Sequence, residues 1–152
     1  MEENNLNGNA GKKDVKVFYI FGEVECGSYA FVLQFVNKYK LCYNNIRYKN
    51  NFWLGVYRDG ATVAMYENFI YSFVPYDEFL VLTSNTVQFL NIKSDTCPNN
   101  FTKIFLFGQD KSNKIYRIIK NNLFHKKVKC YSFEELKLLD NPEKELGFID
   151  NE

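Results

Sequence analysis

The chain has 152 residues, of which 46% are hydrophobic and 18% aromatic, and its 19 basic residues nearly balance its 18 acidic ones. This composition is that of one globular domain with a proper core, and it excludes both a disordered chain and a protein whose overall charge attracts polyanions. No apolar run reaches the roughly 18 residues of a membrane span, and the polar start excludes a signal peptide. These features predict a cytoplasmic protein without a transmembrane segment.

The N-terminal residues 1–14 are Asn, Gly and charged side chains, so we expect a disordered polar tail there. Short runs rich in β-branched and aromatic residues follow, separated by turn residues, and they indicate an antiparallel sheet. The expected strands cover residues 15–24, 28–36, 52–58, 61–66, 69–74, 78–83, 86–92, 101–107, 113–120 and 127–131. Residues 28–39 also fit a helical face, so a helix there stays open as an alternative.

Two neighbouring runs carry the clearest strand pattern. In residues 52–58 and 61–66 apolar side chains occupy every second position and so share one face of each strand. Asp59-Gly60 between the two runs is typical of a tight hairpin turn with positive φ. Regular short strands with such breaks predict an all-β antiparallel β-sandwich, although an open barrel that holds a ligand has the same alternation.

One helix signal lies near the end of the chain. Ser132 with Glu135 three residues later matches a capping box, which predicts a short C-terminal helix before Pro142. The expected organisation is therefore a single β-sandwich domain over residues 15–140, followed by an acidic C-terminal tail over residues 141–152.

The stretch GEVECGS, from Gly22 to Ser28, has the outline of a phosphate-binding loop. A working loop of that kind needs a lysine after its second glycine, and here Ser28 follows Gly27 directly. Glu23 and Glu25 inside the stretch would repel phosphate, and as a carboxylate pair they have no apolar surroundings that would raise one pKa for catalysis. We interpret the stretch as a strand that turns at glycine.

Cysteine and histidine give no sign of a metal centre. The four cysteines, Cys26, Cys42, Cys97 and Cys130, form no C-x-x-C pair, and His125 is the single histidine. We therefore predict no metal, no cofactor and no enzymatic activity. Thiol or redox chemistry centred on Cys26 is an alternative, but a resolving cysteine and a nearby basic residue are missing.

Charge is distributed unevenly near the C-terminus. Residues 103–129 hold eight basic residues against Asp110 alone, with aromatic residues between them, whereas residues 131–152 are acidic. The basic stretch is a candidate site for anionic lipid or RNA, unless the acidic segment covers it. The candidate residues are Lys111, Lys114, Arg117, Lys120, Lys126, Lys127 and Lys129.

A series of short motifs resembles the B-nine domain, a variant of the C-two β-sandwich found in ciliary transition-zone proteins. The matching stretches, in chain order, are GEVECGSY (residues 22–29), Trp53, DGATVAM (residues 59–65), FVPYDEF (residues 73–79) and FTKIFLFGQD (residues 101–110). Two departures occur: Thr102 stands where the family has proline, and the family's later Gly-Tyr-Gly element has no counterpart after Arg117.

The resemblance implies a non-catalytic module that assembles with related β-sandwich subunits at the base of a cilium or flagellum. We therefore expect a protein–protein scaffold, with a location at the cytoskeleton or basal body. Aromatic side chains are common contact anchors in interfaces, and Trp53 and Tyr57 are the candidate interface residues.

Overall fold

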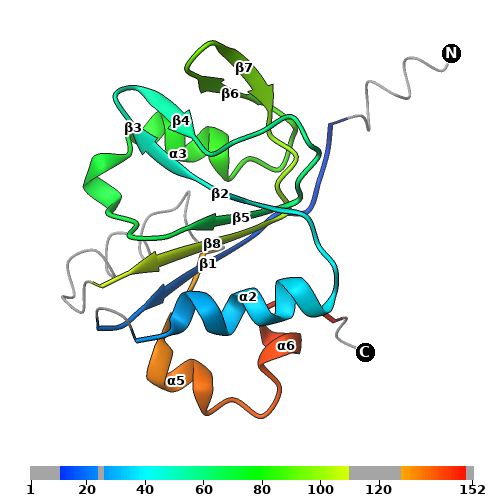
Figure 1. The fold of residues 1–152 in the computed structure, drawn as a ribbon, viewed down its shortest axis with the longest axis vertical. Helices are drawn as coiled ribbons and strands as arrows, with labels where there is room; N and C mark the ends of the chain where they lie inside the picture. The colour runs from blue at the N-terminus through cyan, green and yellow to red at the C-terminus, as the bar shows by residue number, and fades with distance from the viewer. Residues whose placement is uncertain (1–10, 24–25, 110–127, 150–152) are drawn as a thin grey trace, which may run out of the picture.

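The computed structural model describes residues 11–23, 26–109 and 128–149 of the chain. Its centre is a five-stranded sheet in which all neighbouring strands are parallel, in the order β2-β5-β8-β1-β9 (Figure 1). The strands are β1 (Lys16–Phe21), β2 (Tyr43–Asn45), β5 (Val63–Tyr66), β8 (Lys103–Gly108) and β9 (Val128–Ser132). The fold is therefore α/β, and the predicted all-β antiparallel C-two-like sandwich is wrong.

The sheet is the middle of three layers (Figure 1). On one face lie the helices α2, α5 and α6, and on the other lie the helix α3, the 3-10 turn η1 and two hairpins. The helical elements are α2 (Ser28–Lys38), η1 (Tyr71–Phe73), α3 (Tyr76–Leu82), α5 (Phe133–Lys137) and α6 (Pro142–Glu145). The hairpins are β3 (Arg47–Lys49) with β4 (Phe52–Leu54), and β6 (Phe89–Ile92) with β7 (Asp95–Pro98).

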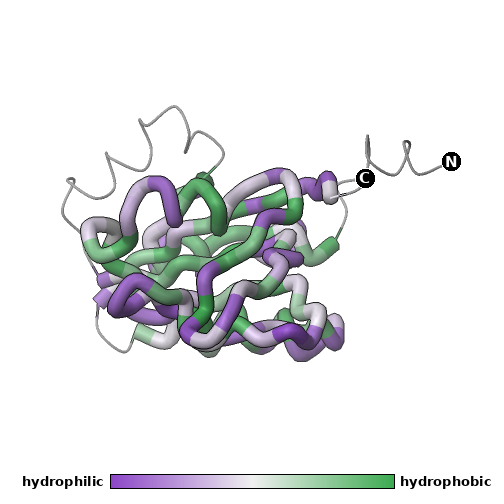
Figure 2. Tube along the Cα trace, turned by 90° about the horizontal axis from the view of Figure 1, so that it is seen from above, coloured by the Kyte–Doolittle hydropathy of each residue, from purple (hydrophilic) through white to green (hydrophobic). Residues whose placement is uncertain are grey.

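Both faces of the inner strands are buried, which explains why the sandwich prediction fails. In β1, Phe18 and Ile20 pack on the side of α2, while Val17 and Tyr19 pack on the side of α3. Strands covered on both faces are nearly continuous apolar runs, and such runs are typical of parallel sheets. Figure 2 shows hydrophobic stretches inside the fold and many of the hydrophilic ones in the connecting turns.

The helix α2 settles the alternative that the sequence left open. The expected strand over residues 28–36 is wrong, because Ser28, Val32 and Val36 are buried at the four-residue spacing of one helical face. Gly27 precedes the helix with φ of 95°, a conformation that favours glycine. The packing of this face on the sheet outweighs the strand preference of its β-branched and aromatic residues.

The predicted hairpin around Asp59-Gly60 is also wrong. Strand β4 pairs with β3 instead, through Asn50 and Asn51, whose φ values of 53° and 71° fit a two-residue hairpin turn. Asp59 Oδ1 accepts a hydrogen bond of 3.0 Å from the backbone N–H of Ala61, which turns the chain into β5. Asparagine tolerates positive φ, so this Asn-Asn pair forms the hairpin turn that Asp59-Gly60 does not.

Other expected strands have mixed outcomes. The ranges 15–24, 61–66, 101–107 and 127–131 locate β1, β5, β8 and β9 to within a few residues, and the range 86–92 contains β6. The range 69–74 contains η1, and the range 78–83 overlaps α3, so both strand predictions are wrong. Helix α3 begins after Pro75 and carries Asp77 and Glu78 in its first turn, where acidic residues are favoured. The range 113–120 lies outside the described residues.

The predicted capping box is confirmed at the start of α5. The backbone N–H of Glu135 donates to Ser132 Oγ at 3.1 Å, and the backbone N–H of Ser132 donates to Glu135 Oε1 at 3.1 Å. After α5 the side chain of Asn141 caps α6, and Leu146 behind it is fully buried. The segment expected to be an acidic tail thus contributes a helix and a core residue.

Gly55 and Gly60 allow a test of how tightly the hairpin β3–β4 is joined to the sheet. Both have positive φ, 81° and 77°, but a Cβ at Gly55 would collide with the backbone carbonyl of Asn45, whereas nothing lies within 4 Å of one at Gly60. We expect Gly60→Ala to lower the free energy of unfolding by about 1 kcal/mol, from backbone strain alone. Gly55→Ala should lower it by more than about 3 kcal/mol. Urea denaturation measures both, and equal losses would contradict the described junction.

Candidate functional site

The topology points to one edge of the sheet as the place for a site. After β1 the chain enters α2 on one face, and after β5 it enters η1 and α3 on the other face, with β8 between the two strands. In open parallel sheets, ligands bind in the crevice beyond the carboxyl ends of strands whose connections leave to opposite faces. This edge meets that condition.

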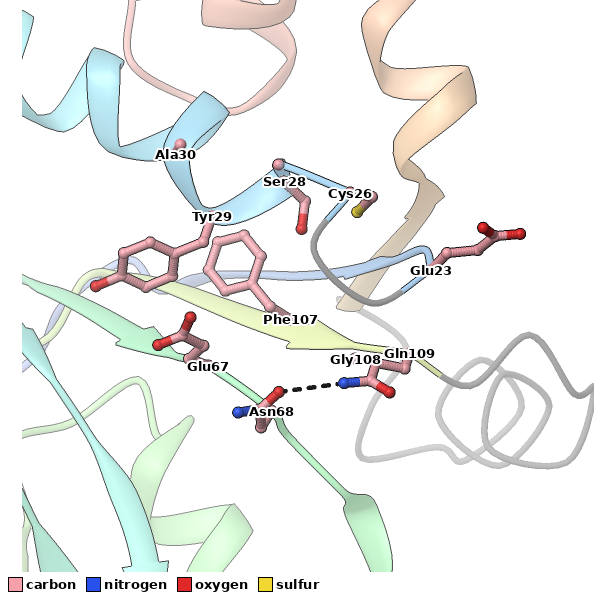
Figure 3. Close-up of a pocket in the computed structure, with 11 residues that line it drawn as sticks. Glu23, Cys26, Ser28, Tyr29, Ala30, Glu67, Asn68, Phe107, Gly108 and Gln109 are labelled. Carbon is pink, nitrogen blue, oxygen red and sulfur yellow. Dashed lines mark hydrogen bonds between the residues drawn. The ribbon is translucent and has the colours of Figure 1, made fainter.

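A hollow of about 310 Å³ lies at that edge, and we call it the edge pocket (Figure 3). Three strands and one helix build it: the ends of β1, β8 and β5, and the first turn of α2. Its lining residues are Glu23, Cys26, Gly27, Ser28, Tyr29, Ala30, Glu67, Asn68, Phe107, Gly108 and Gln109.

The first turn of α2 presents hydrogen-bond donors to the edge pocket. The first intrahelical bond there runs from the backbone N–H of Phe31 to the carbonyl of Gly27, at 2.9 Å, and Gly27 itself has no side chain to cap this end. The preceding N–H groups of an α-helix have no acceptor within the helix. The side chain of Ser28 is directed into the pocket although the residue is only 9% exposed (Figure 3).

Tyr29 and Phe107 form an aromatic wall of the edge pocket. Their ring centroids lie 5.3 Å apart. The hydroxyl of Tyr29 donates a hydrogen bond to Asn45 Oδ1, which ties α2 to the end of β2. Burial raises the pKa of Tyr29 to about 12, helped by the nearby Tyr43 and Glu67. Tyr29 is therefore a neutral donor near neutral pH.

A second hollow, of about 860 Å³, lies beside the edge pocket and shares Glu67 and Asn68 with it. We call it the aromatic groove. Three of its lining residues are large hydrophobic side chains that reach solvent: Tyr57 is 66% exposed, Ile70 40% and Phe73 67%. The other lining residues are Asn45, Ile46, Arg47, Tyr48, Lys49, Leu54, Gly55 and Tyr66.

The hairpin β3–β4 lines part of the aromatic groove and is held in place by contacts with its neighbours. Trp53 is buried, at 1% exposure, and its Nε1 donates to Glu78 Oε1 at 3.0 Å. Tyr48 packs edge-on against Trp53 with ring centroids 5.1 Å apart, and the backbone N–H of Tyr48 donates to the hydroxyl of Tyr66 at 2.9 Å. The hairpin is thus fixed to both α3 and β5.

The structure separates the two candidate interface residues. Trp53 is a core residue, so its side chain is not available as a contact anchor on the folded surface. Tyr57 is exposed beside Ile70 and Phe73, two residues that the sequence analysis missed because it placed them in a strand. No sequence pattern identified these two residues, because an apolar residue in a connecting segment can be either exposed or buried.

The basic candidate site is mostly untested. Lys129 lies in β9 and is exposed, and the other six candidates lie outside the described residues. Those six are Lys111, Lys114, Arg117, Lys120, Lys126 and Lys127.

Cys26 lies at the junction between β1 and α2 and is half-buried in the wall of the edge pocket. It is the only cysteine among the residues that line this pocket, so a partner thiol is missing from the lining. Within the described ranges, no group of three or more His, Cys, Asp and Glu side chains gathers in a way that would hold a metal ion.

Comparisons with known proteins do not place the chain in a family. No protein-family model matches it, and no curated protein matches it either. The resemblance to the B-nine domain is wrong, because that family is a β-sandwich and this sheet is parallel with helices on both faces. No helix in the described part of the chain has the length and apolar composition to cross a membrane.

Tyr29 gives a pH-dependent test of the edge pocket. Its pKa of about 12 in the folded chain lies above the ordinary value of 10.0. Between these values the unfolded chain loses the phenol proton and the folded chain keeps it, so the contribution of Tyr29 is complete below pH 10 and is lost by pH 12. We expect Tyr29→Phe to flatten the decline of unfolding free energy with alkaline pH. A phenolate absorbance transition near pH 10 that disappears with Tyr29→Phe would contradict the described environment.

Proposed function

We propose that this chain is a non-catalytic protein–protein interaction module that docks a partner in the aromatic groove. The observation that carries the proposal is the grouping of Tyr57, Ile70 and Phe73, all exposed, in one hollow. Single exposed apolar residues are ordinary, but a group of them beside polar residues is typical of an interaction surface. Tyrosine also contributes strongly to binding energy where it is buried by a partner.

Charge in the groove favours a particular kind of partner. Arg47 and Lys49 alternate with the inward-facing Tyr48 along β3, and both are exposed. Against these two cations the lining contains one carboxylate, that of Glu67. The partner that fits is a protein segment with apolar anchors flanked by acidic residues, because opposite charges steer such a segment into the groove.

The groove is supported by buried contacts, which lowers the cost of binding. The backbone N–H of Tyr57 donates to Asn44 Oδ1 at 3.1 Å, and Asn44 is itself buried and donates to Asp59 at 3.2 Å. On the other side, the backbone N–H of Phe73 donates to the carbonyl of Ile70 at 3.0 Å within the turn η1. Residues held in this way lose less conformational freedom when a partner binds.

A crosslinking experiment tests the proposal. The full chain with a photo-crosslinking residue at position 57 should capture a partner from the source cells, and mass spectrometry should identify it. Tyr57→Ser and Phe73→Ser should each weaken binding of the purified partner at least about tenfold by calorimetry, because each removes an exposed anchor. Both variants should keep their free energy of unfolding within about 0.5 kcal/mol of the unchanged chain.

Leu138 provides the matched control, since it is 83% exposed and lies after α5 on the opposite face of the sheet. Leu138→Ser should leave the affinity unchanged. A partner that binds Tyr57→Ser and Phe73→Ser as tightly as the unchanged chain would refute docking in the aromatic groove.

A further inference from the structure

The edge pocket contains the hydroxyl group of Ser28, which has no partner among the residues that the structure describes. Ser28 is the first residue of α2, it is nine-tenths buried, and its side chain forms no hydrogen bond to any residue that the structure describes. Figure 3 shows it directed into the hollow between α2 and the ends of the strands. The hydroxyl oxygen faces this open hollow and is not bonded to a described residue, so it is available to donate to a ligand there.

The N-terminal end of α2 makes the same wall favourable for negative charge. The helix has 11 residues, and its end carries a positive partial charge of about half an elementary charge. The N-cap residue Gly27 has no side chain that could cap the first N–H groups, so these groups can donate to a bound oxyanion together with the hydroxyl of Ser28.

A carboxylate stands on the opposite side of the same hollow. Glu67 follows the last residue of β5, it is exposed, and Figure 3 shows its carboxylate across the pocket from α2, near Tyr29. Its full negative charge exceeds the partial charge of the helix end, so a simple anion would be attracted at one wall and repelled at the other.

A ligand with both signs of charge satisfies both walls. A hollow of about 310 Å³ suits a small organic molecule. The rings of Tyr29 and Phe107 lie between the walls and would contact its apolar middle.

We propose that the edge pocket binds a small zwitterion, with its carboxylate at Ser28 and the first turn of α2 and its ammonium group at Glu67. This site is distinct in chemistry from the aromatic groove, although Glu67 lies on the boundary of both hollows. A result that refutes one of the two proposals therefore does not refute the other.

The test uses the full ¹⁵N-labelled chain and a series of linear amino acids, from glycine through β-alanine and 4-aminobutyrate to 6-aminohexanoate. At least one member should shift the backbone signals of Ser28, Tyr29 and Glu67 in a saturable titration. It should bind at least about tenfold more tightly than its two singly charged analogues, the carboxylic acid and the amine of the same chain length. The proposal is overturned if no amino acid of the series binds, or if the simple carboxylate binds as tightly.

Substitutions separate the two ends of the site. Glu67→Gln should weaken zwitterion binding at least about fivefold and should not weaken binding of the simple carboxylate. Ser28→Ala should weaken both ligands by similar factors, because it removes a donor to their shared group. Glu23→Gln is the matched control, since Glu23 lines the same pocket but its carboxylate points away from it (Figure 3). Equal effects of Glu23→Gln and Glu67→Gln would show a general charge effect and refute the assignment.

The aromatic groove provides an independent check. Tyr57→Ser should leave zwitterion binding unchanged, because Tyr57 does not line the edge pocket. A loss of zwitterion binding in this variant, with the fold intact by its NMR spectrum, would place the ligand in the groove and overturn the assignment to the edge pocket.

Discussion

The rest of the structure depends on the burial of both faces of the inner strands. Strands β1, β5 and β8 have apolar side chains on successive residues, so each face of the sheet must be covered by other elements. Parallel strands also need long connections that cross from one end of the sheet to the other. The chain meets both needs together, since α2 covers one face on its way to β2, while α3 and the hairpin β6–β7 cover the other on the way to β8.

The position of both hollows follows from this arrangement. Because the strands are parallel, β1, β5 and β8 all end at one edge, and α2 starts there with the side chain of Ser28 directed into the hollow. The end of β5 then separates the two hollows, with Glu67 and Asn68 facing each of them. In our proposals the edge pocket binds a small ligand, and the aromatic groove beside it docks a protein segment. Two surfaces of different chemistry thus share one rigid support.

The sequence predicted some features and missed others for identifiable reasons. It located four of the five sheet strands and the capping box at Ser132, because these signals are local. It could not show which strands pair, since pairing depends on contacts between residues far apart in the chain. Asp59-Gly60 has the composition of a hairpin turn, yet β5 is buried on both sides and pairs with β2 and β8. At the site, the missing lysine was enough to interpret GEVECGS as a turn without the chemistry of a phosphate-binding loop. The sequence alone could not show that Ser28 begins a helix and faces a hollow, because this depends on the packing of Val32 and Val36.

The most direct test of the parallel fold is an NMR measurement of strand pairing and of the start of α2 in the full chain. The parallel fold predicts contacts between the backbone of β1 and both β8 and β9 in parallel register, with Phe18 opposite Phe105 and Lys129. It also predicts helical carbon shifts from Ser28 to Lys38. Antiparallel contacts between residues 52–58 and 61–66, with extended shifts over residues 28–36, would contradict it and would remove the support for both hollows.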